Sequence, residues 1–435
     1  MTAHKHLKKL VRARMTKTGE SYATARRHVL RDTPKPPTDP TLRWHFPGNV
    51  PATTALRVLL AHAGVRAPHT GQPFTEAMLF GIAGGVGIGV FSFLYEKEDF
   101  ASFFVAGRHS WQDDVAYLKS ACERFGIAPV VRESGGAKLA ERHLTECLAA
   151  GPCVAWVDST HLPHRAMPIQ WSGGGYHVIT VYRIDAEAAT IGDLTDDPIA
   201  IPLADLATAR ARIKKQKNRL LSVPKAPPCP DLLSLVRDGL QACHDGLTKC
   251  KGNFNLTAIR TWAERMHGSK TKDAWERVFA PGHRFWTGLT AIHSYVDHYF
   301  SGGGLCRPLF ADFLTEAADA LKRPTLTALA KRYADLGDAW SELADVALPD
   351  RVPAMKEAKE LYNRRSELLH AGAPADEVRA VWTRLGELGA AARAKFPLND
   401  IECAELRADL QRRLHALYEG ELAAAAALNV TLQSL

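Results

Sequence analysis

The stretch that decides the fold is Ser172-Gly-Gly-Gly-Tyr-His177-Val-Ile-Thr-Val-Tyr182, which is followed by Thr190-Ile-Gly-Asp193. Its β-branched and aromatic residues predict a strand that begins close to His177. The glycines before it allow another backbone or a substrate to approach closely. A separation of 16 residues suits a histidine on one strand and Asp193 on the hairpin partner of that strand.

A histidine at the start of a strand, beside a cleft, can act as a general acid or base. An acid on the neighbouring strand can hold the imidazole in one tautomer and stabilise its charged form. His177 and Asp193 are therefore candidate catalytic residues. The spacing alone leaves a second interpretation open, in which His177 is a structural histidine and Asp193 begins a turn.

The residues around this stretch predict helices first and strands afterwards. Short apolar runs closed by turn residues indicate strands at 153–158, 176–182, 190–193 and 199–203. Apolar positions with helical spacing precede them at 52–64, 113–125 and 139–150. This order favours an α+β domain over alternating βαβ units.

Two proline-rich segments divide the chain. We expect a basic helical arm over 1–33, a stiff proline-rich linker over 34–41 and the α+β domain over 42–225. Beyond the second proline cluster, residues 230–435 carry recurring apolar positions at helical spacing and almost no strand signal. They predict an all-α C-terminal domain.

The excess positive charge lies at the N-terminus. The net charge is +8, and residues 1–31 carry nine Lys and Arg against the single acid Glu20. An argument for nucleic acid therefore rests on the arm alone, and Tyr22 is its one aromatic residue. A basic arm also suits the acidic surface of an acyl-carrier protein, so we expect a carrier protein in preference to nucleic acid.

The cysteines and the apolar segments indicate a cytoplasmic protein. The eight cysteines are scattered, and residues 1–31 have neither the apolar core nor the cleavage site of a secretory signal. The uncharged run 77–95 contains five glycines and has acids on both flanks. We interpret it as a buried glycine-rich core segment and expect no membrane contact.

Several pieces of the sequence, in the same order, resemble one known family. Residues 53–60, 75–87, 151–158, 161–163 and 175–179 resemble the N-terminal domain of the butirosin-biosynthesis H-protein family, which is related to papain-like cysteine peptidases. Residues 253–263 and 303–317 resemble the uncharacterised helical domain that often follows it. The resemblance implies a papain-like α+β domain followed by an all-α domain.

The family also implies a reaction. A cysteine thiolate takes an acyl or aminoacyl group from the phosphopantetheine thioester of a carrier protein and passes it to a small-molecule amine, forming an amide. The resemblance makes His177 the general base and Asp193 its orienting residue. It implies neither a metal nor a cofactor held by the chain itself, and the oligomeric state stays open.

The nucleophile departs from the family pattern. The family has His-Cys shortly before Thr/Ser-Ala-Leu, whereas this sequence has Asn49-Val50-Pro51-Ala52-Thr53-Thr54-Ala55-Leu56, with Pro51 where the cysteine is expected. Three explanations are open. The domain is a pseudoenzyme that binds; or His177 activates an amine that attacks the thioester directly; or Thr53, Thr54 or a cysteine from elsewhere is the nucleophile.

Four residues are candidates for substrate binding: Asn49, Glu76, Tyr176 and Arg307. Glu76 can bind an amine or serve as a structural cap or ion-pair partner. Arg307 follows three glycines and can hold a phosphate or a carboxylate, or pair with Asp312 or Glu316. The sequence thus favours an amide-forming acyltransferase of specialised metabolism. A pseudoenzyme binding module is the alternative, and a peptidase-like hydrolase is the weaker third.

Overall fold

The computed structural model describes residues 3–20, 22–30, 42–110 and 113–435. The chain forms two compact units. The first comprises Met1–Leu79, Asp114–Leu235 and Arg365–Trp382, and the second comprises Phe80–Asp113, Val236–Arg364 and Thr383–Leu435. The units therefore do not follow the linear boundaries predicted from the prolines. The predicted linker, 34–41, lies outside the described residues.

The first unit contains a six-stranded sheet in which every neighbouring pair is antiparallel. The strand order is β3 (Val130–Arg132), β8 (Leu220–Ser222), β4 (Cys153–Asp158), β5 (Tyr176–Ile184), β6 (Ala188–Gly192) and β7 (Ile199–Pro202). The four longer strands lie close to their predicted positions. The two three-residue strands, β3 and β8, are too short to show a period in the sequence.

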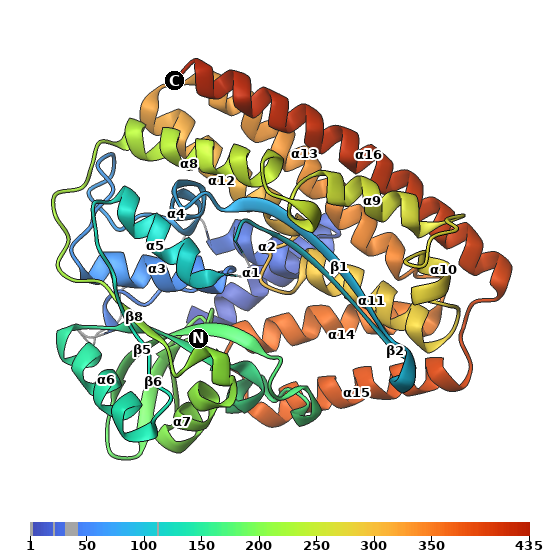
Figure 1. The fold of residues 1–435 in the computed structure, drawn as a ribbon, viewed down its shortest axis with the longest axis horizontal. Helices are drawn as coiled ribbons and strands as arrows, with labels where there is room; N and C mark the ends of the chain where they lie inside the picture. The colour runs from blue at the N-terminus through green and yellow to red at the C-terminus, as the bar shows by residue number, and fades with distance from the viewer. Residues whose placement is uncertain (1–2, 21, 31–41, 111–112) are drawn as a thin grey trace. The chain divides into compact units, whose positions relative to one another are not determined.

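Helices cover both faces of this sheet (Figure 1). On one face, α6 (Ala137–Ala150) and α7 (Leu203–Arg212) pack against alternate strand residues such as Ile179 and Val181. The opposite face of β5 carries Thr180 and Tyr182, and there the sheet meets α3 (Pro51–His62). Side chains alternate between the faces of a strand, so one strand contributes to both layers.

The N-terminal arm forms two helices, α1 (Ala3–Thr18) and α2 (Tyr22–Leu30), which contact each other. Val11 of α1 packs with Tyr22 and Ala25 of α2 in a small apolar core, with Met15 and Val29 at its edge. The arm is thus a folded helical hairpin that has a core of its own. The first unit also contains α5 (Asp114–Arg124).

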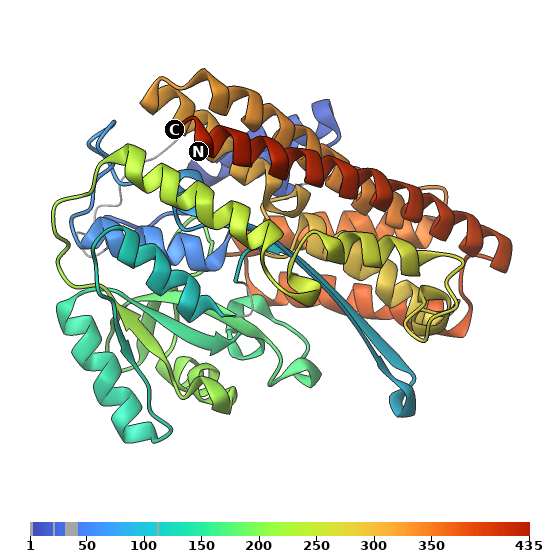
Figure 2. The same cartoon turned by 45° about the horizontal axis from the view of Figure 1, so that its top comes forward.

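The apolar run 77–95 is divided between two elements. Its first part belongs to α4 (Glu76–Ile82), and its second part forms β1 (Val86–Tyr95), which pairs with β2 (Phe100–Arg108) in a two-stranded ribbon (Figure 2). The residues from Val86 to Val90 are buried, as the sequence predicts for a core segment, whereas Phe93 and Tyr95 at the far end of β1 are exposed, so the prediction is wrong for that end of the run. Among the described helices, none has the length and apolar character needed to cross a membrane.

The C-terminal part is helical throughout, as predicted. Its helices are α8 (Leu232–Thr248), α9 (Thr257–Met266), α10 (Trp275–Val278), α11 (His283–Asp297), α12 (Arg307–Leu321), α13 (Pro324–Ala347), α14 (Pro353–His370), α15 (Ala375–Ala394) and α16 (Asp400–Gln433). The two long helices α13 and α16 pack along each other (Figure 2). The fold is therefore a mixed α/β part with one main sheet, followed by an all-helical part.

Candidate functional site

His177 and Asp193 lie at neighbouring ends of two paired strands. His177 is the second residue of β5, and Asp193 directly follows β6. The His177 Nε2 donates a hydrogen bond of 2.6 Å to Oδ1 of Asp193, and both side chains are fully buried. The hairpin relationship expected from the sequence spacing therefore brings these two residues together.

The glycine run fixes where β5 begins. The carbonyl of Gly175 accepts hydrogen bonds from the backbone N–H and the hydroxyl of Ser159, at 2.8 and 3.1 Å. The N–H of Gly173 donates to the carboxylate of Asp158 at 2.5 Å. A Cβ on Gly175 would lie 2.5 Å from that carboxylate, so no larger residue fits there without movement. The glycines thus permit a close approach between two backbone segments of the protein.

Two further side chains bind Asp193, and no local pattern in the sequence predicts either of them as its partner. Arg165 donates from Nε to Oδ2 at 2.7 Å and from Nη2 to Oδ1 at 2.8 Å. His164 donates from Nε2 to Oδ2 at 2.6 Å. Asp193 therefore accepts from one guanidinium and two imidazoles, because an ionised carboxylate has acceptor sites for several donors at once.

His164 and Arg165 belong to η4 (Pro163–Arg165), a single 3-10 turn whose first residue is proline. The turn is held from outside, since the indole N–H of Trp382 donates to the carbonyl of Arg165 at 3.2 Å. The sequence shows two histidines, at 161 and 164, but the contact of His164 with Asp193 spans 29 residues, and His161 bonds to Ser172 instead. A pattern of short-range spacing carries no signal for such a contact.

The charges in this cluster set two pKa values. Burial, followed by the positive charge of Arg165, lowers the pKa of His177 to about 4. Burial alone would raise the pKa of Asp193, but Arg165, His177 and His164 together hold it well below its usual value. At neutral pH the cluster therefore pairs an ionised Asp193 and a charged Arg165 with a neutral His177 that donates from Nε2.

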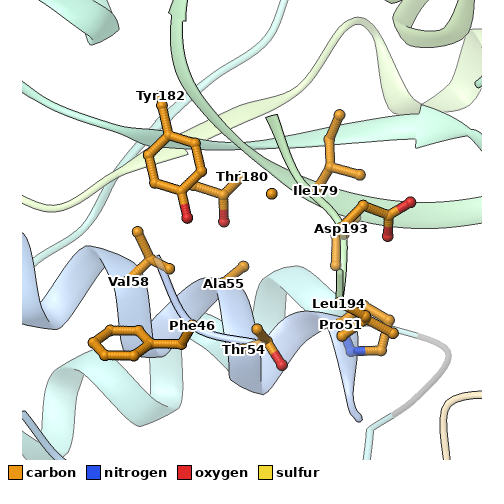
Figure 3. Close-up of a pocket in the computed structure, with 12 residues that line it drawn as sticks. Phe46, Pro51, Thr54, Ala55, Val58, Ile179, Thr180, Tyr182, Asp193 and Leu194 are labelled. Atoms are coloured by element: carbon orange, nitrogen blue, oxygen red, sulfur yellow. The ribbon is translucent and has the colours of Figure 1, made fainter. Parts of the chain in front are cut away.

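A small cavity lies between α3, β5 and the turn after β6 (Figure 3). Its volume is about 10 Å³, which is near the minimum that holds one water molecule. Pro51, Asp193 and Leu194 are among its lining residues, whereas His177 is not. In Figure 3 the Asp193 carboxylate is directed away from the ring of Tyr182. The polar cluster around Asp193 and the cavity are thus adjacent, and the cavity does not expose His177.

The first turn of α3 is capped by Glu76. Pro51 is the first helical residue, where proline fits well because its missing N–H has no helical partner. The Glu76 Oε1 accepts from the N–H groups of Asn49 and Val50, both at 2.8 Å, and from the Thr54 hydroxyl at 2.9 Å. Its Oε2 accepts from the Asn49 side chain at 2.9 Å. This placement favours the structural alternative for Glu76 and Asn49 over the predicted contact with substrate.

The two threonines that were candidate nucleophiles are engaged elsewhere. The Thr53 hydroxyl is fully buried and shares a hydrogen bond of 3.0 Å with the hydroxyl of Tyr117. Thr54 lines the cavity, but its hydroxyl donates to Glu76. A threonine nucleophile needs a base within hydrogen-bond reach, and neither contact supplies one from His177.

Cysteines from elsewhere in the first unit do not line the cavity. Cys147 and Cys153 belong to the apolar core between the sheet and the helices α6 and α7. Cys122 is buried in α5, and this burial raises its pKa to about 12. A thiol in that state is a poor nucleophile, because the reactive species is the thiolate.

The last two candidates for substrate binding are Tyr176 and Arg307. Tyr176 is 44 % exposed, and the ammonium of Lys215 lies 4.6 Å from its ring centroid. Arg307 belongs to the second unit, where its fully buried guanidinium donates to Glu421 at 2.7 Å and to the carbonyl of Gly87 at 2.8 Å. The ion pair is therefore with Glu421, and this placement favours a structural role for Arg307.

The arrangement of the side chains around Asp193 does not resemble a metal site. In the ranges that the structure describes, no three His, Cys, Asp or Glu side chains converge as metal ligands would. The donors around Asp193 include a guanidinium, which competes for the carboxylate and repels a cation.

Comparison with known families assigns the class. Residues 51–194 match the family described as butirosin biosynthesis protein H, N-terminal. Residues 204–383 match a family described as a domain of unknown function, DUF4872. No curated protein matches the sequence.

A butirosin H-type N-terminal domain followed by this helical domain is the architecture expected from the sequence resemblance. The chain therefore matches the butirosin biosynthesis protein H-like architecture. The first match relates its N-terminal part to an enzyme domain of antibiotic biosynthesis.

Proposed function

We propose that this chain acts in specialised metabolism as a binding member of its family, with a papain-like domain that performs no nucleophilic catalysis. The observation that carries the proposal is Pro51 as the first residue of α3, lining the cavity beside Asp193. Proline has neither a thiol nor a hydroxyl, and the hydroxyls of Thr53 and Thr54 bond to Tyr117 and Glu76. The candidate ligand is the acyl group of a carrier-protein thioester, as the family resemblance implies.

The state of His177 also supports binding over catalysis. A general base works best when its pKa lies near the operating pH. Burial and Arg165 lower the pKa of His177 to about 4, so this imidazole is a weak base at neutral pH. Arg165 further neutralises the carboxylate that would otherwise stabilise an imidazolium.

A second candidate function is the direct acyl transfer that the sequence favours. One observation supports it: Asp193 holds the proton of His177 on Nε2, which leaves Nδ1 as the basic nitrogen of the ring. In that reaction Nδ1 takes a proton from an amine as the amine attacks the thioester carbonyl; the C–S bond then breaks, and the protonated imidazole returns the proton to the leaving thiolate of the carrier.

One assay separates the two candidates. The wild type and His177→Ala are each incubated with an acyl thioester of N-acetylcysteamine and an amino-sugar, and the released thiol and the amide are measured. The binding proposal predicts that both proteins release thiol at the rate of buffer, while the thioester resonances broaden in the presence of the wild type. Release of thiol and amide that depends on His177 would establish acyl transfer instead.

A further inference from the structure

One side chain of the N-terminal arm bonds to the two segments that border the cavity. The guanidinium of Arg26, in α2, is fully buried. Its Nη1 donates to the carbonyl of Gly48 at 3.2 Å, and its Nη2 donates to the carbonyl of Leu194 at 3.4 Å. The Nη2 also forms an ion pair of 2.5 Å with Asp196.

These acceptors lie on the two segments that border the cavity. Gly48 precedes the first turn of α3, in which Pro51 lines the cavity. Leu194 lines the cavity itself and directly follows Asp193. Arg26 therefore joins the segment that leads into α3 to the turn that follows β6, and it does so from an element outside the α/β domain.

Two other contacts hold the arm over the same turn. The ring of Tyr22 stacks on His370, with the centroids 5.9 Å apart. The carbonyl of His370 in turn accepts from the N–H of Asp196 at 2.7 Å. Arg12 of α1 pairs with Glu367 at 2.5 Å. The arm is thus docked by contacts with the Asp196 turn and with the segment Arg365–Trp382.

We infer that Arg26 is a positioning residue that holds together the two segments bordering the cavity, and that withdrawal of the arm opens the cavity to an organic ligand. A cavity of about 10 Å³ holds one water, so anything larger needs a state in which its walls separate. Loss of the guanidinium leaves the buried carboxylate of Asp196 without this partner and removes a donor from both carbonyls. The open state therefore gains population when Arg26 is absent.

The test uses an engineered thiol in the full chain as a reporter of access. Pro51→Cys places a thiol at the cavity wall, and its alkylation by iodoacetamide is followed by mass spectrometry of the peptide that contains residue 51. We expect Arg26→Ala to raise the alkylation rate by roughly tenfold or more, because a buried ion pair is lost. Arg26→Lys keeps the positive charge but loses the planar guanidinium that donates to two carbonyls at once. Its alkylation rate should therefore lie between those of the parent and of Arg26→Ala.

The matched control is Arg14→Ala. Arg14 pairs with Glu20 inside the arm, at 2.7 Å, so its loss removes an arginine without touching the cavity walls. We expect the rate at residue 51 to stay within about twofold of the parent, as for an exposed pair. Alkylation of the buried Cys122, measured in the same peptide digest, reports global unfolding.

Equal alkylation rates at residue 51 with and without Arg26, while Cys122 stays protected, would overturn the inference. If Arg26→Ala also exposes Cys122, the variant has unfolded, and Asp196→Asn is used in its place. This second variant must raise the alkylation rate at residue 51 while Cys122 stays protected; any other result would contradict the inference. The readout is access to an engineered thiol and not thioester turnover, so its result is independent of the proposed function.

Discussion

Arg165 and His177 share one carboxylate. Both donate to Oδ1 of Asp193, at 2.8 and 2.6 Å, and Arg165 also donates to Oδ2. In a catalytic pair the carboxylate is available to stabilise the imidazolium that forms during the reaction. Here the guanidinium already neutralises it, which supports the proposal that His177 and Asp193 are structural members of a buried polar cluster.

The first prediction concerns Arg165. Arg165→Met should raise the pKa of His177, because the guanidinium is one cause of its lowered value. It should also destabilise the protein by about 3 kcal/mol or more, because the buried carboxylate of Asp193 loses two hydrogen bonds. The pKa is measured by NMR of labelled histidine and the stability by urea unfolding.

The matched control for Arg165 is Arg132→Met, which removes an exposed ion pair with Glu146. We expect it to cost at most about 1 kcal/mol. A similar, small loss for both variants would show that the cluster around Asp193 does not stabilise the fold as described.

The second prediction concerns pH. The pKa of His177 is about 4 in the folded protein and about 6.5 in an unfolded chain, so the unfolded state binds the extra proton first as pH falls. The contribution of His177 is therefore fully present above about pH 6.5 and is lost between there and pH 4, by about 3 kcal/mol at most. Asp193, whose folded pKa is depressed, adds a further loss at lower pH.

The measurement is the free energy of unfolding in urea between pH 4.5 and 7, for the wild type and for His177→Gln. Other buried histidines with a lowered pKa, such as His370, also make the free energy of unfolding fall as the pH falls. The contribution of His177 is therefore the difference in slope between the wild type and the variant. The variant should show the shallower slope. Identical slopes would mean that His177 is not buried in a neutral form.

The third prediction tests the cap on α3. Glu76→Ala removes the acceptor of four hydrogen bonds at the N-terminus of the helix and should cost about 2–4 kcal/mol. Hydrogen exchange of residues 50–56 should increase in the variant more than that of α6. Glu264→Ala, at an exposed helical position paired with Arg260, serves as the control and should change stability by less than about 0.5 kcal/mol.

If Glu76 instead binds a substrate amine, the variant keeps its stability and loses ligand affinity. Stability and affinity together therefore decide between the two roles that the sequence left open for this residue.

Much of the local structure could be predicted from the sequence. The strand after the glycine run was expected at 176–182 and is β5 (Tyr176–Ile184), because its β-branched residues and flanking glycines are local signals. The helix expected at 52–64 is α3 (Pro51–His62), because its apolar period is clear. Spacing along the chain also placed His177 and Asp193 on paired strands, which brings them to 2.6 Å.

The rest depends on contacts that leave no local pattern. Arg165 reaches Asp193 from a 3-10 turn, and Arg26 reaches Asp196 across 170 residues. Arg26 was counted from the sequence as one charge of a basic arm, whereas its side chain is fully buried. Long-range ion pairs of this kind depend on how elements dock, and a single sequence shows only the charges.

The most direct test of the central claim is the intact mass of the wild-type protein after incubation with an acyl thioester of N-acetylcysteamine. We expect no acyl adduct that depends on His177, because Pro51 stands where the family resemblance implies a cysteine. Adventitious acylation of partly exposed thiols such as Cys229 is located by peptide mapping and should be unchanged in His177→Ala. An acyl group that is bound covalently to the wild type and lost in His177→Ala would contradict the claim.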